Sequence, residues 1–114
     1  MESGAEVIIT STDQENFRFR HTILTLVQER RLPAIHAYAD IARAGGLVSY
    51  GVDFDEQSRM AARYVDRLFK GATPGELPFV QPTKWLVVVN LKTAKALGLA
   101  FPESLLARAD EVIE

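Results

Sequence analysis

Short apolar runs alternate along this chain with longer stretches in which apolar residues recur every three or four positions. The short runs, typical of buried strands, are Val7–Thr10, Ala34–Ala37, Leu47–Tyr50 and Trp85–Val89. The longer stretches predict amphipathic helices, and the clearest of them extends from Asp53 to about Lys70. Strand and helix alternate three times before a connector and a last strand with two helices. This order predicts an α/β fold with a mainly parallel sheet and flanking helices.

The start of the first long helix has two candidate caps. Thr12 and Glu15 fit a capping box, in which a hydroxyl and a carboxylate each satisfy a free backbone donor. Asp13 places a negative charge beside the positive end of the helix dipole. We therefore expect one helix over residues 14–31, ended by Pro33. A short helix over residues 38–44 is expected to follow the second strand.

The second half of the chain has equally clear end signals. Asp53 is a plausible N-cap for the long helix, and Gly71 suits its C-terminal end. Residues 71–83 contain three prolines and are expected to be a connector. A short helix over residues 91–97 and a last one over residues 102–109 are predicted, and an acidic tail is expected after them. The stripe along the long helix consists of Phe54, Ala61, Ala62, Val65, Leu68 and Phe69.

Composition narrows the classes of function. A length of 114 residues fits a single domain, or a fragment of a larger one, over residues 1–114. The net charge of −2 gives no basic surface for nucleic acid. Cysteine is absent, and with only His21 and His36 a histidine-rich metal site is not expected, so no cofactor is predicted. No Ser-His-Asp order, carboxylate pair or phosphate loop is present, which argues against an enzyme.

No apolar run reaches the roughly 18 residues that a membrane span needs. The first residues lack a basic region followed by an apolar core, so they do not form a secretory signal, and the chain as written is expected in the cytoplasm.

The stretch from Gly45 to Asp53 is the leading candidate for a ligand-binding edge. In open α/β sheets, ligands bind outside the carboxyl ends of the strands, where the chain turns outward. Tyr50 is expected to stack on or hydrogen-bond a ligand there, although it could equally be a core tyrosine. Ser49 is a weaker candidate, because alternation along a strand aims one of the two neighbours away from the cleft.

Four more polar residues are candidates at the same edge. Asp53 could hold a ligand ammonium group, but its place as an N-cap already explains it. Thr12 and Asp13 follow the first strand at a helix N-terminus, where a carboxylate ligand could dock, and capping explains them equally well. His36 ends the second strand, and a lone histidine in such a place is more often structural than a ligand contact.

The chain also resembles a known family. The resemblance is carried by six segments, which are Leu32–Ile35, Ala44–Gly51, Tyr64–Gly71, Gln81–Lys84, Asn90–Leu99 and Ser104–Ile113. Together they resemble the C-terminal part of the ABC-transporter substrate-binding proteins related to tryptophan- and tyrosine-binding lipoproteins. Relatives usually have Tyr where His36 stands, Met where Val48 stands and Tyr where Ser58 stands.

The resemblance implies a periplasmic-binding-protein-like type I fold, in which two Rossmann-like α/β lobes close on a small ligand. It implies that residues 5–50 belong to the C-terminal lobe. It also implies that the helix from Asp53 to Lys70 packs on an N-terminal lobe that this chain does not encode. The expected role is non-catalytic binding of a small solute, such as an amino acid, for an ABC permease. The expected location is then periplasmic or membrane-anchored.

A second hypothesis is a stand-alone cytoplasmic regulatory or protein-interaction domain that kept the fold and lost transport. In either case the apolar stripe of the long helix would be exposed without an N-terminal lobe. We therefore expect self-association through that helix or through the strand Trp85–Asn90.

Overall fold

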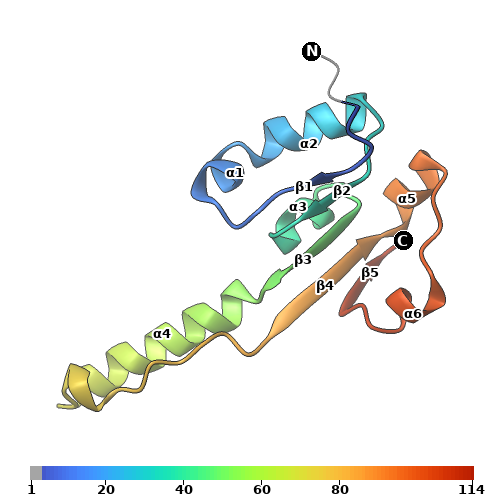
Figure 1. Cartoon of the computed structure of the whole chain (residues 1–114). Helices are drawn as coiled ribbons and strands as arrows, with labels where there is room; N and C mark the ends of the chain where they lie inside the picture. Colours follow the sequence, from blue (N-terminus) through green and yellow to red (C-terminus); the bar gives the residue numbers. More distant parts are fainter. Residues whose placement is uncertain (1–3) are drawn as a thin grey trace. The chain divides into compact units, whose positions relative to one another are not determined.

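The computed structural model describes residues 4–114 and contains a five-stranded sheet in the order β1-β2-β3-β4-β5 (Figure 1). The strands are β1 (Ile8–Ile9), β2 (Ala34–His36), β3 (Val48–Val52), β4 (Trp85–Asn90) and β5 (Glu111–Ile113). The helices are α1 (Gln14–Arg18), α2 (Arg20–Glu29), α3 (Ala39–Arg43), α4 (Phe54–Phe69), the 3-10 helix η1 (Pro74–Glu76), α5 (Leu91–Leu97) and α6 (Glu103–Leu106). The predicted α/β class is confirmed.

The chain divides into two compact units. The larger unit comprises Met1–Gly51 and Leu86–Glu114, and the smaller unit is Val52–Trp85. The last residue of β3, Val52, and the first residue of β4, Trp85, therefore belong to the smaller unit. The chain leaves the larger unit through β3 and returns to it through β4.

The sheet is mainly parallel, as predicted. The pairs β1–β2, β2–β3 and β4–β5 are parallel. At the β3–β4 pair, the Asn90 N–H donates to the Leu47 carbonyl within the larger unit, at 2.9 Å. Within the smaller unit the Asp53 N–H donates to the Lys84 carbonyl, at 3.1 Å. Residue numbers run in opposite directions between these two bonds, which is the arrangement of an antiparallel pair.

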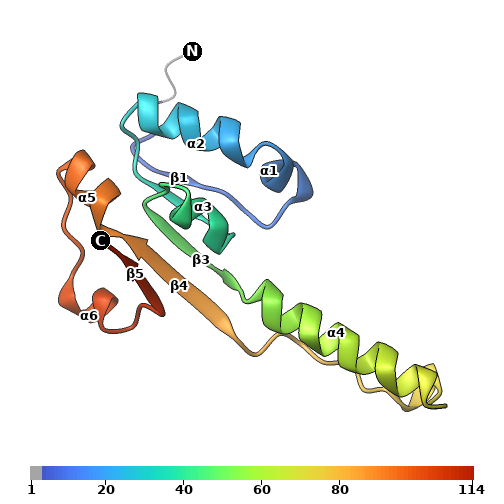
Figure 2. The same cartoon turned by 180° about the vertical axis from the view of Figure 1, so that it is seen from behind.

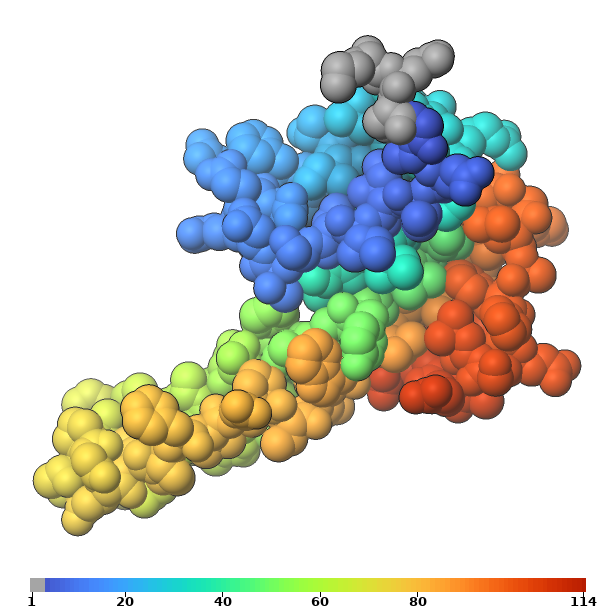
Figure 3. Space-filling view, viewed as in Figure 1, coloured from blue at the N-terminus to red at the C-terminus, as the bar shows by residue number. Residues whose placement is uncertain are grey.

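The core of the larger unit lies between its helices and the sheet. Leu24 and Val27 of α2 pack with Ala34 of β2 and Ile41 of α3, and α2 lies beside α3 (Figure 2). The side of β1 away from this core is exposed: Ile9 is 73% accessible, and the β1 segment lies at the surface in dark blue in Figure 3. The larger unit therefore has its own core and one open, apolar strand.

The smaller unit is built on α4. The Asp53 carboxylate caps it by accepting from the Asp55 and Glu56 N–H groups, and Gly71 follows its end with φ +101°. The connector folds back along α4, where the Tyr64 hydroxyl donates to the Pro78 carbonyl at 2.6 Å. These ends agree with the sequence prediction.

No residue of α4 is buried. Its apolar stripe is accessible along the whole helix, and Phe69 is 89% exposed. Because burial of such a stripe normally supplies most of a helix's stability in a protein, α4 has the sequence of a packed helix with its apolar face uncovered.

Two predictions about the first long helix are wrong. The expected continuous helix over residues 14–31 is divided at Phe19, whose φ of −97° and ψ of 16° separate α1 from α2. The expected capping box of Thr12 and Glu15 does not form. Asp13 is the N-cap instead, and its Oδ1 accepts from the Glu15 N–H at 2.8 Å. A carboxylate one residue later captures the donor that the hydroxyl was expected to satisfy.

The end of the chain also differs from the prediction. The last helix ends at Leu106, and the expected acidic tail contains β5, which pairs with β4. Asp110 starts this pairing because its N–H donates to the Val87 carbonyl while its Oδ2 accepts from the Val87 N–H, both at 2.8 Å. Arg43 of α3 adds a two-pronged ion pair to Glu111. Long-range pairing, which local periodicity does not encode, makes this strand.

The connector and the central strand differ in detail. Residues 74–76 of the connector form η1, with a capping box between Thr73 and Glu76. The central strand was expected to end at Tyr50, but β3 continues through Gly51 to Val52.

Candidate functional site

Three polar residues lie side by side across the sheet: Thr10 follows β1, His36 ends β2, and Ser49 is the second residue of β3. The Thr10 hydroxyl oxygen is 3.0 Å from His36 Nδ1, and the direction of this hydrogen bond depends on the histidine tautomer. His36 stands opposite Ser49 in the parallel register of β2 and β3, so the two side chains share a face of the sheet. All three are buried, and within the described residues His36 Nε2 and Ser49 Oγ lack a hydrogen-bond partner.

Burial sets the electrostatics of this group. Removing the His36 ring from water lowers the pKa of its imidazole below the ordinary value, so the neutral form is favoured. Three residues next to the ring, Thr10, Ser49 and Gly46, carry no charge. A neutral imidazole and two hydroxyls form an uncharged polar group that is buried beneath this end of the sheet.

The glycines of the central stretch make room for this arrangement. A Cβ on Gly46 would stand 2.9 Å from His36 Cδ2 and 2.9 Å from the Ile41 carbonyl oxygen. A Cβ on Gly51 would stand 1.9 Å from the Ala37 carbonyl oxygen. Both distances are shorter than real Cβ contacts, so these two positions require glycine for close approach rather than for an unusual φ.

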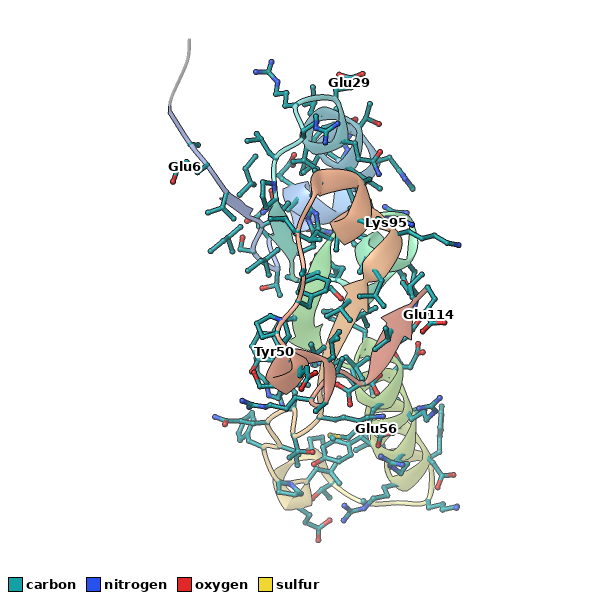
Figure 4. The ribbon with its side chains drawn as sticks, turned by 90° about the vertical axis from the view of Figure 1, so that its right-hand side faces the viewer. Glu6, Glu29, Tyr50, Glu56, Lys95 and Glu114 are labelled. Atoms are coloured by element: carbon teal, nitrogen blue, oxygen red, sulfur yellow. The ribbon has the colours of Figure 1, made fainter. Side chains whose placement is uncertain are left out.

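Tyr50 differs from its neighbour Ser49 in exposure. It is 56% accessible and projects from β3 (Figure 4). The alternation of β3 buries Ser49 and leaves Tyr50 on the other face, as the sequence prediction of one residue in and one residue out requires. An exposed ring with a hydroxyl tip at a strand end can stack on a solute and hydrogen-bond to it.

Thr12 and Asp13 lie in the exposed loop between β1 and α1. The Tyr38 hydroxyl donates to the Thr12 carbonyl at 2.8 Å, and the Tyr38 ring stands 4.7 Å from the ring of Phe17. Asp13 holds the first turn of α1. These contacts order the loop at the same end of the sheet as Thr10 and His36.

Asp53 lies in the smaller unit, and both oxygens of its carboxylate have partners. Its Oδ1 accepts from two backbone N–H groups of α4, and Lys84 Nζ stands 2.9 Å from its Oδ2. The hydrogen bond from the Lys84 ammonium group, followed by that from the Glu56 N–H, lowers the pKa of the Asp53 carboxyl. All its strong acceptor positions therefore have partners inside the chain.

The structure thus brings His36 and Ser49 together, with Thr12 and Asp13 on the loop after β1, and it places Asp53 in the other unit. Sequence reasoning missed Thr10 and Lys84. Thr10 follows β1 and meets the end of β2 in a parallel pair, which the strand register alone could have indicated. Lys84 gave no local signal, because it is far from Asp53 in the sequence.

Two depressions lie away from this edge. One, of about 150 Å³, lies between α2 and α3, with Arg20, His21 and Asp40 in its lining. The other, of about 20 Å³, is mostly apolar and includes Leu32 and Leu97. Among residues 4–114, no group of three or more His, Asp or Glu side chains is placed to hold a metal ion. No helix in the same range is long and apolar enough to cross a membrane.

The chain thus forms a mainly parallel α/β sheet, passes from it into a second unit and returns to it. The chain belongs to the ABC transporter substrate-binding protein family, because the sequence model of that family matches residues 1–113. The resemblance inferred from the sequence is confirmed.

Solved structures agree with this assignment. An ABC domain from Streptococcus pneumonia in complex with L-Trp is 26% identical, with a TM-score of 0.89 over 99% of this chain and 38% of its own. A conserved domain protein from Vibrio cholerae is 25% identical, with a TM-score of 0.87 over 96% of this chain and 37% of its own. A ligand-free, open substrate-binding protein with adhesive properties from Clostridium difficile shares the fold, at 18% identity and a TM-score of 0.65, over 97% of this chain and 37% of its own.

No curated protein matches the chain. The chain spans between a third and two fifths of the length of these solved structures.

Proposed function

We propose that this chain supplies one wall of the binding cleft of a two-lobed solute-binding protein that serves an ABC importer. In this proposal the larger unit is the C-terminal lobe, and its carboxyl-end residues face the solute. The second wall comes from an N-terminal lobe. The observation that carries the proposal is the common fold, over 99% of this chain, with an ABC domain in complex with L-Trp.

The surface of the chain supports the need for a further lobe. Ile9 of β1 is 73% exposed in the larger unit, and no residue of α4 is buried in the smaller one. The open side of β1 and the apolar stripe of α4 are the surfaces that such a lobe would cover.

The solute is proposed to be a small amphipathic molecule such as an amino acid. The L-Trp of the Streptococcus domain belongs to that protein and gives only the class of solute to test here. Tyr50 offers an exposed ring, whereas His36 and Ser49 are buried on the other face of the sheet and are proposed to support this wall of the cleft from inside the larger unit. Thr12 and Asp13 border the same end, and Asp53 is proposed to act indirectly, through α4.

The mechanism follows from differential binding. A solute that contacts both walls makes part of its contacts only when the lobes are closed, so binding shifts the population toward the closed form. The permease then recognises the closed form. Members of this family are generally non-catalytic and extracytoplasmic, and we propose both for this protein.

A thermal-shift screen of amino acids and related solutes tests the proposal. A saturable rise in melting temperature marks a working site, and a solute at 100 times its Kd adds about 2.7 kcal/mol of stability. The Tyr50→Ala variant should keep the ligand-free melting temperature, because the ring is exposed, and should lose most of the shift. Phe69→Ala is the matched control, since it removes an exposed ring from the far end of α4. Equal shifts in both variants would remove Tyr50 from the site.

The uncovered stripe of α4 also favours a second candidate, a protein-interaction domain that associates with itself through this surface. Light scattering at micromolar concentration separates the two. A concentration-dependent dimer that Leu68→Glu dissociates supports self-association. A monomer that binds solute supports the transporter component, whose N-terminal lobe then covers α4.

A further inference from the structure

The chain passes between its two units at two places within the described residues. One passage lies between Gly51 and Val52, and the other between Trp85 and Leu86. A charged residue of the smaller unit lies close to each passage. Asp53 comes two residues after Gly51, and Lys84 comes two residues before Leu86. These two residues connect the passages to each other.

The connection has three parts that all meet at Asp53. Its N–H donates to the Lys84 carbonyl at 3.1 Å. Its Oδ2 receives Lys84 Nζ at 2.9 Å. Its Oδ1 accepts from the Asp55 and Glu56 N–H groups, at 3.1 Å each, and so holds the first turn of α4. One carboxylate therefore joins the outgoing segment, the returning segment and the helix.

Burial makes the connection asymmetric. The Asp53 side chain is 8% exposed, whereas that of Lys84 is 57% exposed. A carboxylate removed from water is costly to leave without a cationic partner, while the lysine can be released into solvent at little cost. Removing the Lys84 ammonium group therefore leaves no cavity. The buried Asp53 carboxylate, in contrast, would then lack its cationic partner.

The larger unit also anchors both passages. Gly51 lies so close to the Ala37 carbonyl that no side chain fits between them. Val87 exchanges two hydrogen bonds with Asp110. Between the anchored positions lie Val52 on the outgoing segment and Trp85–Leu86 on the returning one.

We propose that Asp53 and Lys84 form a clasp that makes the two passages move as one body with α4, so that bending is confined to Val52 and Trp85–Leu86. For solute binding, which rests on the function proposed above, they are positioning residues: they couple the orientation of α4 to closure without touching the solute. Loss of the clasp lets the two passages bend independently.

Amide hydrogen exchange tests the clasp without any solute. Lys84→Met and Asp53→Asn each break the ion pair, and Asn keeps the N-cap because it caps as well as Asp. Both should speed exchange at residues 53–57 by up to about fivefold, the upper range for a partly exposed pair. Lys84→Arg should restore slow exchange. Lys70→Met, which breaks the exposed Asp66–Lys70 pair on the same helix, should leave residues 53–57 unchanged.

Distances between spin labels test the coupling of the passages. The chain has no cysteine, so Glu29→Cys in the larger unit and Ser58→Cys in α4 introduce a unique pair of sites. Lys84→Met should broaden the distribution of label distances, and Lys84→Arg and Lys70→Met should match the parent. A distribution that Lys84→Met leaves unchanged overturns the clasp, as does equal broadening by Lys70→Met.

Measuring solute binding by the same variants distinguishes this inference from the proposed function. If a solute is found, Lys84→Met should change its Kd several-fold while Lys84→Arg restores it. A broadened label distribution with no solute bound by any variant supports the clasp and contradicts the transport role. An unchanged Kd beside a broadened distribution contradicts the positioning role.

Discussion

The two units of this protein stabilise their helices in opposite ways. In the larger unit, α2 and α3 bury Leu24, Val27 and Ile41 against the sheet. In the smaller unit, α4 is the longest helix of the described chain and has no buried residue. Yet α4 has the cleanest amphipathic pattern in the sequence. Amphipathicity therefore predicts that a helix has an apolar face, but not that the same chain covers it.

This difference separates the unit that buries its apolar residues from the unit that exposes them. The larger unit closes its own core, so its carboxyl-end residues are held in place without help. The smaller unit relies on a cap, a hydrogen bond to the connector and the Asp53–Lys84 contact. The smaller unit is therefore held mainly by polar contacts, and the apolar stripe of α4 adds little to its stability.

The largest expected effect comes from truncating the same type of residue in each unit. Ile41→Ala in the larger unit should lower the free energy of unfolding by about 2–5 kcal/mol, because it leaves a cavity in a packed core. Leu68→Ala on α4 should cost less than about 0.5 kcal/mol in the isolated chain, because that side chain is exposed. Urea denaturation followed by circular dichroism measures both.

The same pair of variants also shows whether α4 is covered. If Leu68→Ala costs as much as Ile41→Ala, the stripe is buried in solution by another copy or another lobe, and the contrast between the units fails. Dilution then decides between a second copy, whose effect depends on concentration, and an intramolecular cover, whose effect does not.

A smaller effect is expected from His36, and it belongs to the larger unit alone. Because its folded-state pKa is lowered, the unfolded chain binds the proton more readily, so stability falls as the pH falls below the unfolded pKa of about 6.5. Above that pH the group contributes no pH dependence. Urea midpoints between pH 5 and 8 should show this decline in the parent chain and lose it in His36→Gln.

His21 is the control for this titration, since it lies exposed on α2. His21→Gln should keep the decline below about pH 6.5. If His21→Gln removes the decline instead, the buried ring is not its source. The carboxyl of Asp53 titrates far lower, and its contribution is lost only as the pH falls through its own lowered pKa.

Much of the fold could be predicted from the sequence because its signals are local. The cap of α4 at Asp53 and the glycine after that helix, Gly71, are both in place. The apolar runs identified β2, β3 and β4. Where the prediction was wrong, a non-local contact decided: β5 exists because Asp110 and Glu111 meet Val87 and Arg43 across the sheet.

The location of the candidate site could be predicted from the sequence, but the exposure and the partners of its residues could not. The parallel order implied that the polar residues of β1, β2 and β3 would share one end of the sheet, and the register of the structure pairs His36 with Ser49. It did not indicate that both would be buried while Tyr50 stayed exposed, because the face covered by α3 depends on packing. Nor could spacing reveal that Lys84 meets Asp53.

The smallest expected effect compares one surface ion pair from each unit. Arg43 of the larger unit donates two hydrogen bonds to Glu111 Oε2, and this contact, with Asp40 beside it, raises the pKa of the Arg43 guanidinium. Lys70 of the smaller unit makes a single bond to Asp66 one turn away. Both pairs are solvent-exposed, which limits their worth.

Arg43→Met should cost about 1 kcal/mol, because it releases β5 from α3 as well as breaking the fork, and Lys70→Met should cost about 0.3 kcal/mol. Both costs should shrink in 1 M salt, where charges are screened beyond about 3 Å. Equal costs would mean that β5 is held by its pairing with β4 alone. A larger cost for Lys70→Met would mean that polar contacts stabilise α4 more than they stabilise the edge of the sheet, which would reverse the contrast between the two units.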